Sequence, residues 1–280
     1  AASDNAVMLG PWGRTVTGKF WKNELSDVHA QHTRILIGYI KDNTPGIPPR
    51  INYLKVEPEG SFSDEDQGIV PLGPNEFIKE YTFAFSEPDA KYLSGISFVT
   101  NTGTTYTFGN LPASKFSFTV TEGRPVGFFG WNEGPISSFG VELLATSDKV
   151  VKVGPWGTTE PPNWIHESNA NAQRTNIIIT YGDLIDNITI DPADSSKDRG
   201  DIKKIPIGAD ERISECFVYV KPVSKCLSAL GFTTNKDMYG TYGTVDNTSV
   251  FPLPVTKGKL VGFFGFHEVP VKSIGFLFAP

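Results

Sequence analysis

Two short loops of the chain combine an aromatic side chain with a carboxylate. Trp131-Asn132-Glu133 lies in GFFGWNEGPISSFG (Gly127 to Gly140), and Phe266-His267-Glu268 lies in GFFGFHEVPVKSIG (Gly262 to Gly275). An aromatic face packs against C–H groups and a carboxylate accepts hydrogen bonds from hydroxyl groups, so the pair suits a saccharide. In the alternative interpretation, the aromatic ring caps a core and the glutamate is only solvated.

The two loops belong to a repeat that runs through the whole chain. GPWG at Gly10 returns at Gly154, and VPLGPNEFI at Val70 returns as IPIGADERI at Ile205. Self-similarity on this scale decides the domain organisation before any local pattern does. Because each copy is long enough to bury its own core, the repeat predicts two domains, residues 1–147 and 148–280.

Short apolar runs separated by turn residues fill each copy. They include TRILIGYI, RINYLKVE, FIKEYTFAF, LSGISFVT, FSFTV and SFGVELL. Several alternate apolar and polar residues, all are bounded by Gly, Pro, Asn or Asp, and none has the 3.6-residue period of a long helix. The pattern predicts an all-β chain and leaves open a sandwich, a barrel or a prism.

Composition excludes several classes of partner. The 280 residues carry 25 Lys and Arg against 31 Asp and Glu, a net charge of −6, without a basic cluster for nucleic acid or an anionic membrane. Since no apolar run approaches the roughly 20 residues of a spanning helix, we expect no membrane insertion. A start at Ala1 fits either a cytoplasmic protein without its initiator Met or a secreted protein after signal cleavage, and homo-oligomer formation is left open.

Several motifs in succession resemble those of jacalin-related lectins. They are GPWG at each domain start, YGDLIDNITI (Tyr181 to Ile190), FTTNKDMYGTYG (Phe232 to Gly243) and VFPLPVTKGKLVGFFG (Val250 to Gly265). The resemblance covers the second copy almost entirely and the first more loosely. It implies two tandem β-prism (type I) domains, each of three four-stranded antiparallel Greek-key sheets, and carbohydrate binding without catalysis, metal or cofactor.

The resemblance also indicates where sugar would bind and where this chain departs from the family. In the family, three loops surround one sugar pocket: a Gly-Gly loop after GPWG, a hairpin loop and a last loop. An aspartate of the last loop accepts hydrogen bonds from the sugar. That aspartate is replaced by Ser137 and Lys272, which we interpret as surface strand residues, and Glu133 and Glu268 are its candidate substitutes. The expected carbohydrate-binding residues are Gly13, Arg14, Trp131, Asn132, Glu133 and Ser137 in the first domain, and Gly157, Thr158, Phe266, His267, Glu268 and Lys272 in the second.

Other conspicuous residues have structural interpretations. Trp12, Trp156, Trp21 and Trp164 occupy equivalent places in both copies and are predicted to be core residues. Cys216 and Cys226 flank KPVSK, and a hairpin turning near Pro222 would oppose them, as it would Tyr81 and Tyr92 in the first copy. Two interpretations stay open: a disulfide between the two cysteines, or two buried free thiols.

The residue spacing and motifs of the chain do not favour a metal site or a catalytic site. His29 and His32 are three apart, an odd offset that puts them on opposite faces of a strand. The acidic runs SFSDEDQ (Ser61 to Gln67) and DPADSSKDRGD (Asp191 to Asp201) lack the ligand order of an EF-hand. We find no nucleophile elbow, P-loop, HExxH or Rossmann glycine run.

The sequence therefore predicts a carbohydrate-binding lectin rather than an enzyme. Its ligands would be mannose/glucose- or galactose-type glycans or glycoproteins, bound at two non-identical, atypical sites at the loop ends of the prisms. The alternative is a β-prism scaffold, or a protein-interaction or defence module, that does not bind sugar.

Overall fold

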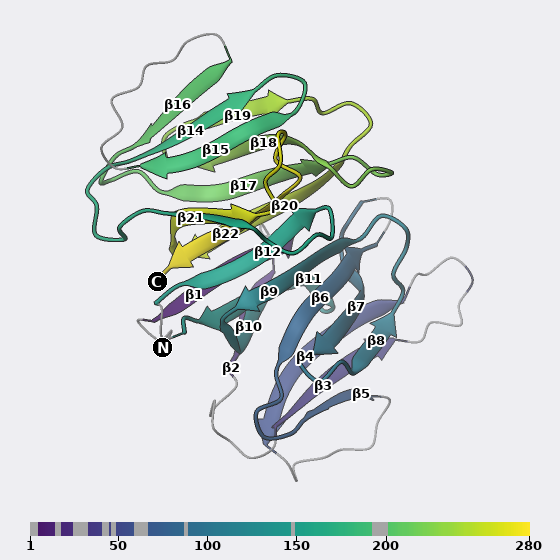
Figure 1. Ribbon diagram of the computed structural model, residues 1–280. Helices are drawn as coiled ribbons and strands as arrows, with labels where there is room; N and C mark the ends of the chain where they lie inside the picture. The colour runs from purple at the N-terminus through teal and green to yellow at the C-terminus, as the bar shows by residue number, and fades with distance from the viewer. Residues whose placement is uncertain are drawn as a thin grey trace. The chain divides into compact units, whose positions relative to one another are not determined.

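The computed structural model describes residues 5–14, 18–24, 33–40, 45, 49–58, 67–86, 89–146, 149–191 and 201–280 (Figure 1). Its described regular structure is made of 22 β-strands and contains no helix. The all-β prediction is confirmed. His29, His32 and most of the two acidic runs lie outside the described residues.

The chain divides into two compact units. The N-terminal unit consists of Met8–Thr119 and Arg124–Leu144, and the C-terminal unit consists of Ala1–Val7, Val120–Gly123 and Ala145–Pro280. The domain bounds 1–147 and 148–280 stay a prediction.

The strands that lie wholly or mainly in the N-terminal unit form three antiparallel sets, with the orders β1-β11-β10-β2, β9-β6-β7-β8 and β4-β3-β5. The three-stranded set begins with TRILIGYI, which forms β3 at the bounds that its alternation predicts. The strands are β1 (Ala6–Gly13), β2 (Lys19–Glu24), β3 (Thr33–Ile40), β4 (Arg50–Pro58), β5 (Gln67–Leu72), β6 (Ile78–Phe85), β7 (Leu93–Thr100), β8 (Thr105–Gly109), β9 (Phe116–Glu122), β10 (Arg124–Asn132) and β11 (Ile136–Leu144).

The C-terminal unit repeats this arrangement, with the orders β13-β21-β22-β12, β19-β18-β17-β20 and β15-β14-β16. Figure 1 shows β15, β14 and β16 side by side. The strands are β12 (Val151–Gly157), β13 (Trp164–Glu167), β14 (Thr175–Tyr181), β15 (Ile185–Asp191), β16 (Ile202–Ile207), β17 (Ile213–Val220), β18 (Leu227–Thr234), β19 (Met238–Gly243), β20 (Ser249–Lys257), β21 (Lys259–Gly265) and β22 (Ser273–Ala279). Both units are β-prisms, in which one of the three sets has three described strands.

Aromatic packing fills the interior of each prism. Trp12 is 3% exposed and stacks on Phe118, with ring centroids 5.1 Å apart. In the other unit Trp156 is partly buried and stacks on Phe251 at 4.7 Å. Trp21 and Trp164 are also partly buried, and their indole Nε1 atoms have no exposed surface. The core interpretation is confirmed for Trp12, whereas the other three tryptophans lie at the core's edge.

The predicted opposition of the two cysteines is wrong. β17 and β18 pair so that Cys216 lies opposite Phe232, and Cys226 lies in the six-residue loop before Leu227. The same register places Tyr81 opposite Phe98 in the other unit, not opposite Tyr92. Both thiols are free, as expected for two cysteines that are not cross-strand neighbours.

Candidate functional site

In the N-terminal unit, the turn after β1 and the last loop, between β10 and β11, are joined by their backbones. The Arg14 amide donates to the Ser137 carbonyl at 2.9 Å. Gly13 has φ +100°, and a Cβ there would lie 2.5 Å from the same carbonyl oxygen. Only glycine fits this left-handed position under a carbonyl, so the glycine after GPW brings the two loops together.

Ser137 itself lies inside the prism, so its interpretation as a surface residue is wrong. Its side chain is fully buried and its hydroxyl has no hydrogen-bond partner. The neighbouring Ser138 hydroxyl is also buried and accepts a hydrogen bond of 2.8 Å from the Trp131 amide. Both serines belong to a strand, β11, that is buried on both faces from Ile136 to Leu143, and a register shift between Trp131 and Asn132 leaves Ser137 without a paired residue on β10.

The exposed part of this loop presents the aromatic and acidic groups. The Trp131 ring meets Phe20 edge to face at 5.6 Å, and Phe20 is 49% exposed. The Glu133 amide donates to Pro135 at 3.0 Å, which closes the turn and leaves the partly exposed Glu133 carboxylate outside it. That carboxylate forms no ion pair within the described part of the chain. The sequence did not single out Phe20, although it directly precedes Trp21.

The C-terminal unit repeats the same joint. The Thr158 amide donates to the Lys272 carbonyl at 3.1 Å, and a Cβ on Gly157, whose φ is +126°, would lie 2.2 Å from that oxygen. The Leu227 amide, after the β17–β18 hairpin loop, donates to the same carbonyl at 3.3 Å. Three loops therefore meet at one backbone oxygen, as the resemblance implies.

In the last loop of the C-terminal unit, the Glu268 carboxylate forms an ion pair with a lysine. Lys272 Nζ lies 2.9 Å from Glu268 Oε2, with side-chain exposures of 29% and 59%. The Glu268 carboxylate raises the pKa of Lys272, first by hydrogen bonding and then by its charge. Because a paired carboxylate has fewer free lone pairs for hydroxyl groups, Glu268 is a poorer acceptor than Glu133.

His267 is also engaged. Its backbone amide donates to Asn163 Oδ1 at 2.8 Å, and its ring Nε2 lies 3.1 Å from the Asp186 carbonyl oxygen. The ring also contacts Trp164 edge to face at 6.2 Å. The predicted residues of each unit are thus brought together, but the second loop is tied down by its own partners.

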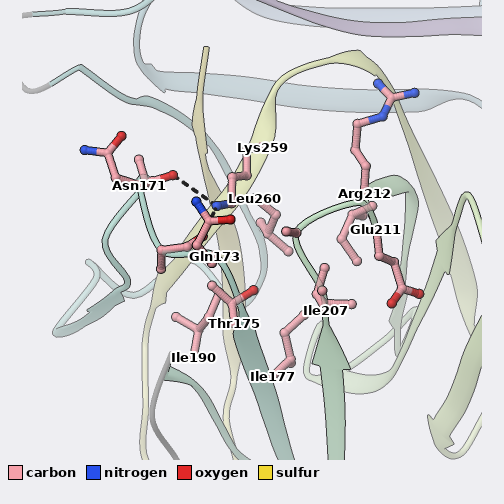
Figure 2. Close-up of a pocket in the computed structure, with 15 residues that line it drawn as sticks. Asn171, Gln173, Thr175, Ile177, Ile190, Ile207, Glu211, Arg212, Lys259 and Leu260 are labelled. Carbon is pink, nitrogen blue, oxygen red and sulfur yellow. Dashed lines mark hydrogen bonds between the residues drawn. The ribbon is translucent and has the colours of Figure 1, made fainter.

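A separate pocket of about 390 Å³ lies in the C-terminal unit, away from these loops (Figure 2). Its floor is aliphatic, from Ile177, Ile190, Ile207 and Leu260. On its rim, Lys259 Nζ donates to the carbonyls of two loop alanines at 3.0 and 2.9 Å. The polar side chains of Asn171, Gln173, Thr175, Glu211 and Arg212 also line it, and none of the predicted site residues does.

No group of three or more His, Cys, Asp or Glu within the described residues could hold a metal ion. Nor does this part of the chain contain a helix of the length and apolarity needed to cross a membrane.

The fold and the loop geometry match a known class. The model of the Jacalin-like lectin domain matches the chain twice, at residues 9–142 and 153–277. The chain therefore belongs to the jacalin-like lectin family, as the resemblance predicted. This membership places it among the lectins, a class of non-enzymatic proteins.

Its relatives carry lectin names. The chain is 26% identical to a mannose/glucose-specific lectin of Parkia platycephala, over 67% of this chain and 45% of that protein. It is 26% identical to jacalin-related lectin 22 of Arabidopsis thaliana, over 82% of this chain and 57% of that protein. The chain thus spans about half the length of these curated relatives.

Solved structures of lectins are similar to part of the chain. One is a mannose-binding jacalin-related lectin from Ananas comosus, 23% identical, with a TM-score of 0.39, covering 47% of this chain and 99% of that one. Another is a mannose-specific jacalin-related lectin from Morus nigra in complex with mannose, 25% identical, with a TM-score of 0.38, covering 48% of this chain and 97% of that one.

Proposed function

We propose that this chain is a carbohydrate-binding lectin with two unlike sites, of which the N-terminal one is the stronger. The observation that carries the proposal is the contact of two aromatic rings, Phe20 on β2 and Trp131 at the end of β10, beside the loop that holds the unpaired Glu133 carboxylate. The rings supply apolar faces for sugar C–H groups, and the carboxylate accepts from two hydroxyls.

The ligand class proposed is a neutral hexose of the mannose/glucose type, with galactose as the second choice. Mannose and glucose come first because the relatives from Parkia are described as specific for them. In this chain, Glu133 replaces the family's aspartate from a different position of the same loop. Affinity for one sugar unit is expected to be weak, because an open loop buries few ligand atoms.

The site of the C-terminal unit is expected to contribute less to sugar binding than the site of the N-terminal unit. Glu268 is paired with Lys272, and His267 is held by Asn163 and Asp186. Binding through both loops would still raise avidity on a surface that allows both to engage.

A glycan microarray with the purified chain tests the proposal. The wild type is compared with Glu133→Ala, Glu268→Ala and the double variant. We expect binding to mannose/glucose- or galactose-type glycans that falls most in Glu133→Ala. A wild-type array that stays silent at high protein concentration would refute sugar binding.

The second candidate function is a scaffold that binds protein rather than sugar. It is favoured by the two positions of the family's aspartate, since Ser137 is fully buried and Lys272 is a cation in an ion pair. Neither residue can supply the missing carboxylate. A silent array together with a folded protein would favour this candidate.

A further inference from the structure

A groove of about 500 Å³ runs from the Trp131–Glu133 loop along the side of the N-terminal prism. One wall is β2, from Phe20 to Asn23, and the other is β4, from Asn52 to Glu57. Asn132 lies at the end next to the loop. Because a strand rises about 3.3 Å per residue, the β4 wall is roughly 16 Å long. That length exceeds a single sugar ring.

Contacts within the N-terminal unit hold the walls of the groove in place. Asn23 on β2 donates from its side chain to the Leu54 carbonyl on β4 at 2.6 Å, so one amide ties the two walls together. Tyr53 is fixed on the β4 wall because its ring covers Gly38, where a Cβ would lie 2.1 Å from it.

The chemistry of the groove resembles that of the loop beside it. Phe20 offers an aromatic face, and Asn52 and Asn132 offer side-chain amides that donate and accept. The Tyr53 ring lies beside Lys55, whose Nζ is 4.8 Å from the ring centroid, and Lys22 and Glu57 add one charge of each sign to the lining. Neither of these two amides has a hydrogen bond within the described residues. A run of hydroxyl groups and C–H faces along a sugar chain would satisfy both kinds of group.

In the C-terminal unit, a hydrogen bond bridges the position that corresponds to the groove. Asn132 corresponds to His267 in the repeat of GFFG, and the registers Tyr39 with Ile51 and Tyr181 with Ile185 make Asn52 correspond to Asp186. There, His267 Nε2 reaches the Asp186 carbonyl at 3.1 Å and bridges the loop to β15. In the first unit the shorter Asn132 stands in place of His267, no such bridge to β4 is formed among the described residues, and the groove is open there.

We infer that the N-terminal unit binds a linear neutral oligosaccharide, with one end on the Trp131–Glu133 loop and its further units in the groove between β2 and β4. The inference rests on the proposed function of the same loop. It adds the ligand's length, the direction in which it leaves the loop, and the residues that select it. The C-terminal unit would bind only the terminal sugar.

Calorimetric titration of the whole chain with sugars of two lengths tests this. The probes are methyl α-mannoside and an α-linked mannotriose, with methyl β-galactoside and a β-galactotriose as the second pair. We expect one trisaccharide to bind at least about tenfold more tightly than its monosaccharide, the value of one or two net hydrogen bonds. Asn52→Ala and Tyr53→Leu should each remove most of that gain and leave monosaccharide affinity unchanged.

Asn187→Ala is the matched control, because Asn187 occupies the place of Tyr53 in the second unit and is exposed. It should retain the full gain. Equal affinity for the short and long sugars would overturn the inference while the proposed function stands. A gain that survives both Asn52→Ala and Tyr53→Leu would also overturn it. Binding of neither length would refute the proposed function and the inference together.

Discussion

Lys272 forms an ion pair with Glu268 across the last loop of the C-terminal unit, Nζ to Oε2, at 2.9 Å. The matching residues of the N-terminal unit are Ser137, which is buried, and Glu133, which is partly exposed. One substitution in the repeat thus separates a carboxylate without an ion pair among the described residues from one that is paired with a lysine.

Replacing Lys272 should release the second site. In Lys272→Met, Glu268 loses its partner, and we expect affinity for the preferred monosaccharide at the C-terminal loop to rise by about threefold to tenfold. Stability should change by less than about 1 kcal/mol, because the pair is partly exposed. Titration calorimetry and urea unfolding measure the two effects. Lys236→Met is the control, since it removes a surface pair with Asp210, 2.7 Å long, outside the site; an equal affinity change there would contradict the explanation.

The two buried serines of β11 should respond differently to removal of their hydroxyls. Ser138→Ala deprives the Trp131 amide of its acceptor and should cost about 1 to 3 kcal/mol of unfolding free energy. Ser137→Ala removes a buried hydroxyl without a partner, so we expect it to be neutral or stabilising by up to about 1 kcal/mol. Urea unfolding of both variants gives the comparison. Equal losses would show that the Ser137 hydroxyl has a partner in solution.

Gly157 should be intolerant of a side chain. Gly157→Ala combines a positive φ with a Cβ 2.2 Å from the Lys272 carbonyl oxygen, and we expect a loss of about 3 kcal/mol together with weaker sugar binding. Gly103→Ala isolates the backbone cost, because Gly103 has φ +88° and open space around its Cα. It should lose only about 1 kcal/mol. Thermal or urea unfolding that ranks the two variants the other way would contradict the close approach of the loops.

The two thiols should differ in reactivity. Burial raises the pKa of the Cys216 thiol, with a smaller contribution from Glu215, whereas Cys226 is partly exposed. Because the thiolate is the reactive form, an aromatic disulfide reagent should modify one thiol of the native chain quickly and the second only on unfolding. Cys226→Ser should abolish the fast phase, and Cys216→Ser should retain it. Fast modification of both thiols would mean that β17 opens readily.

Much of the fold follows from local sequence pattern. TRILIGYI and LSGISFVT become β3 and β7 at the residues that their alternation indicates, because one face of each strand must be buried. The repeat gives two prisms, since two similar sequences bury similar cores. The glycine after each GPW marks the joint between loops, because no other residue fits a left-handed position against a carbonyl.

The sequence by itself therefore determined the all-β class, the repeat and the loops that carry the candidate site. The tertiary structure alone decided that Ser137 is buried, that His267 bridges to Asp186, and that a groove separates β2 from β4. Alternation is a property of neighbouring residues and can be read along the chain. Pairing of loops and spacing of sheet edges depend on side chains many residues apart, and a single bulge or a change from His to Asn alters them without changing the strand pattern.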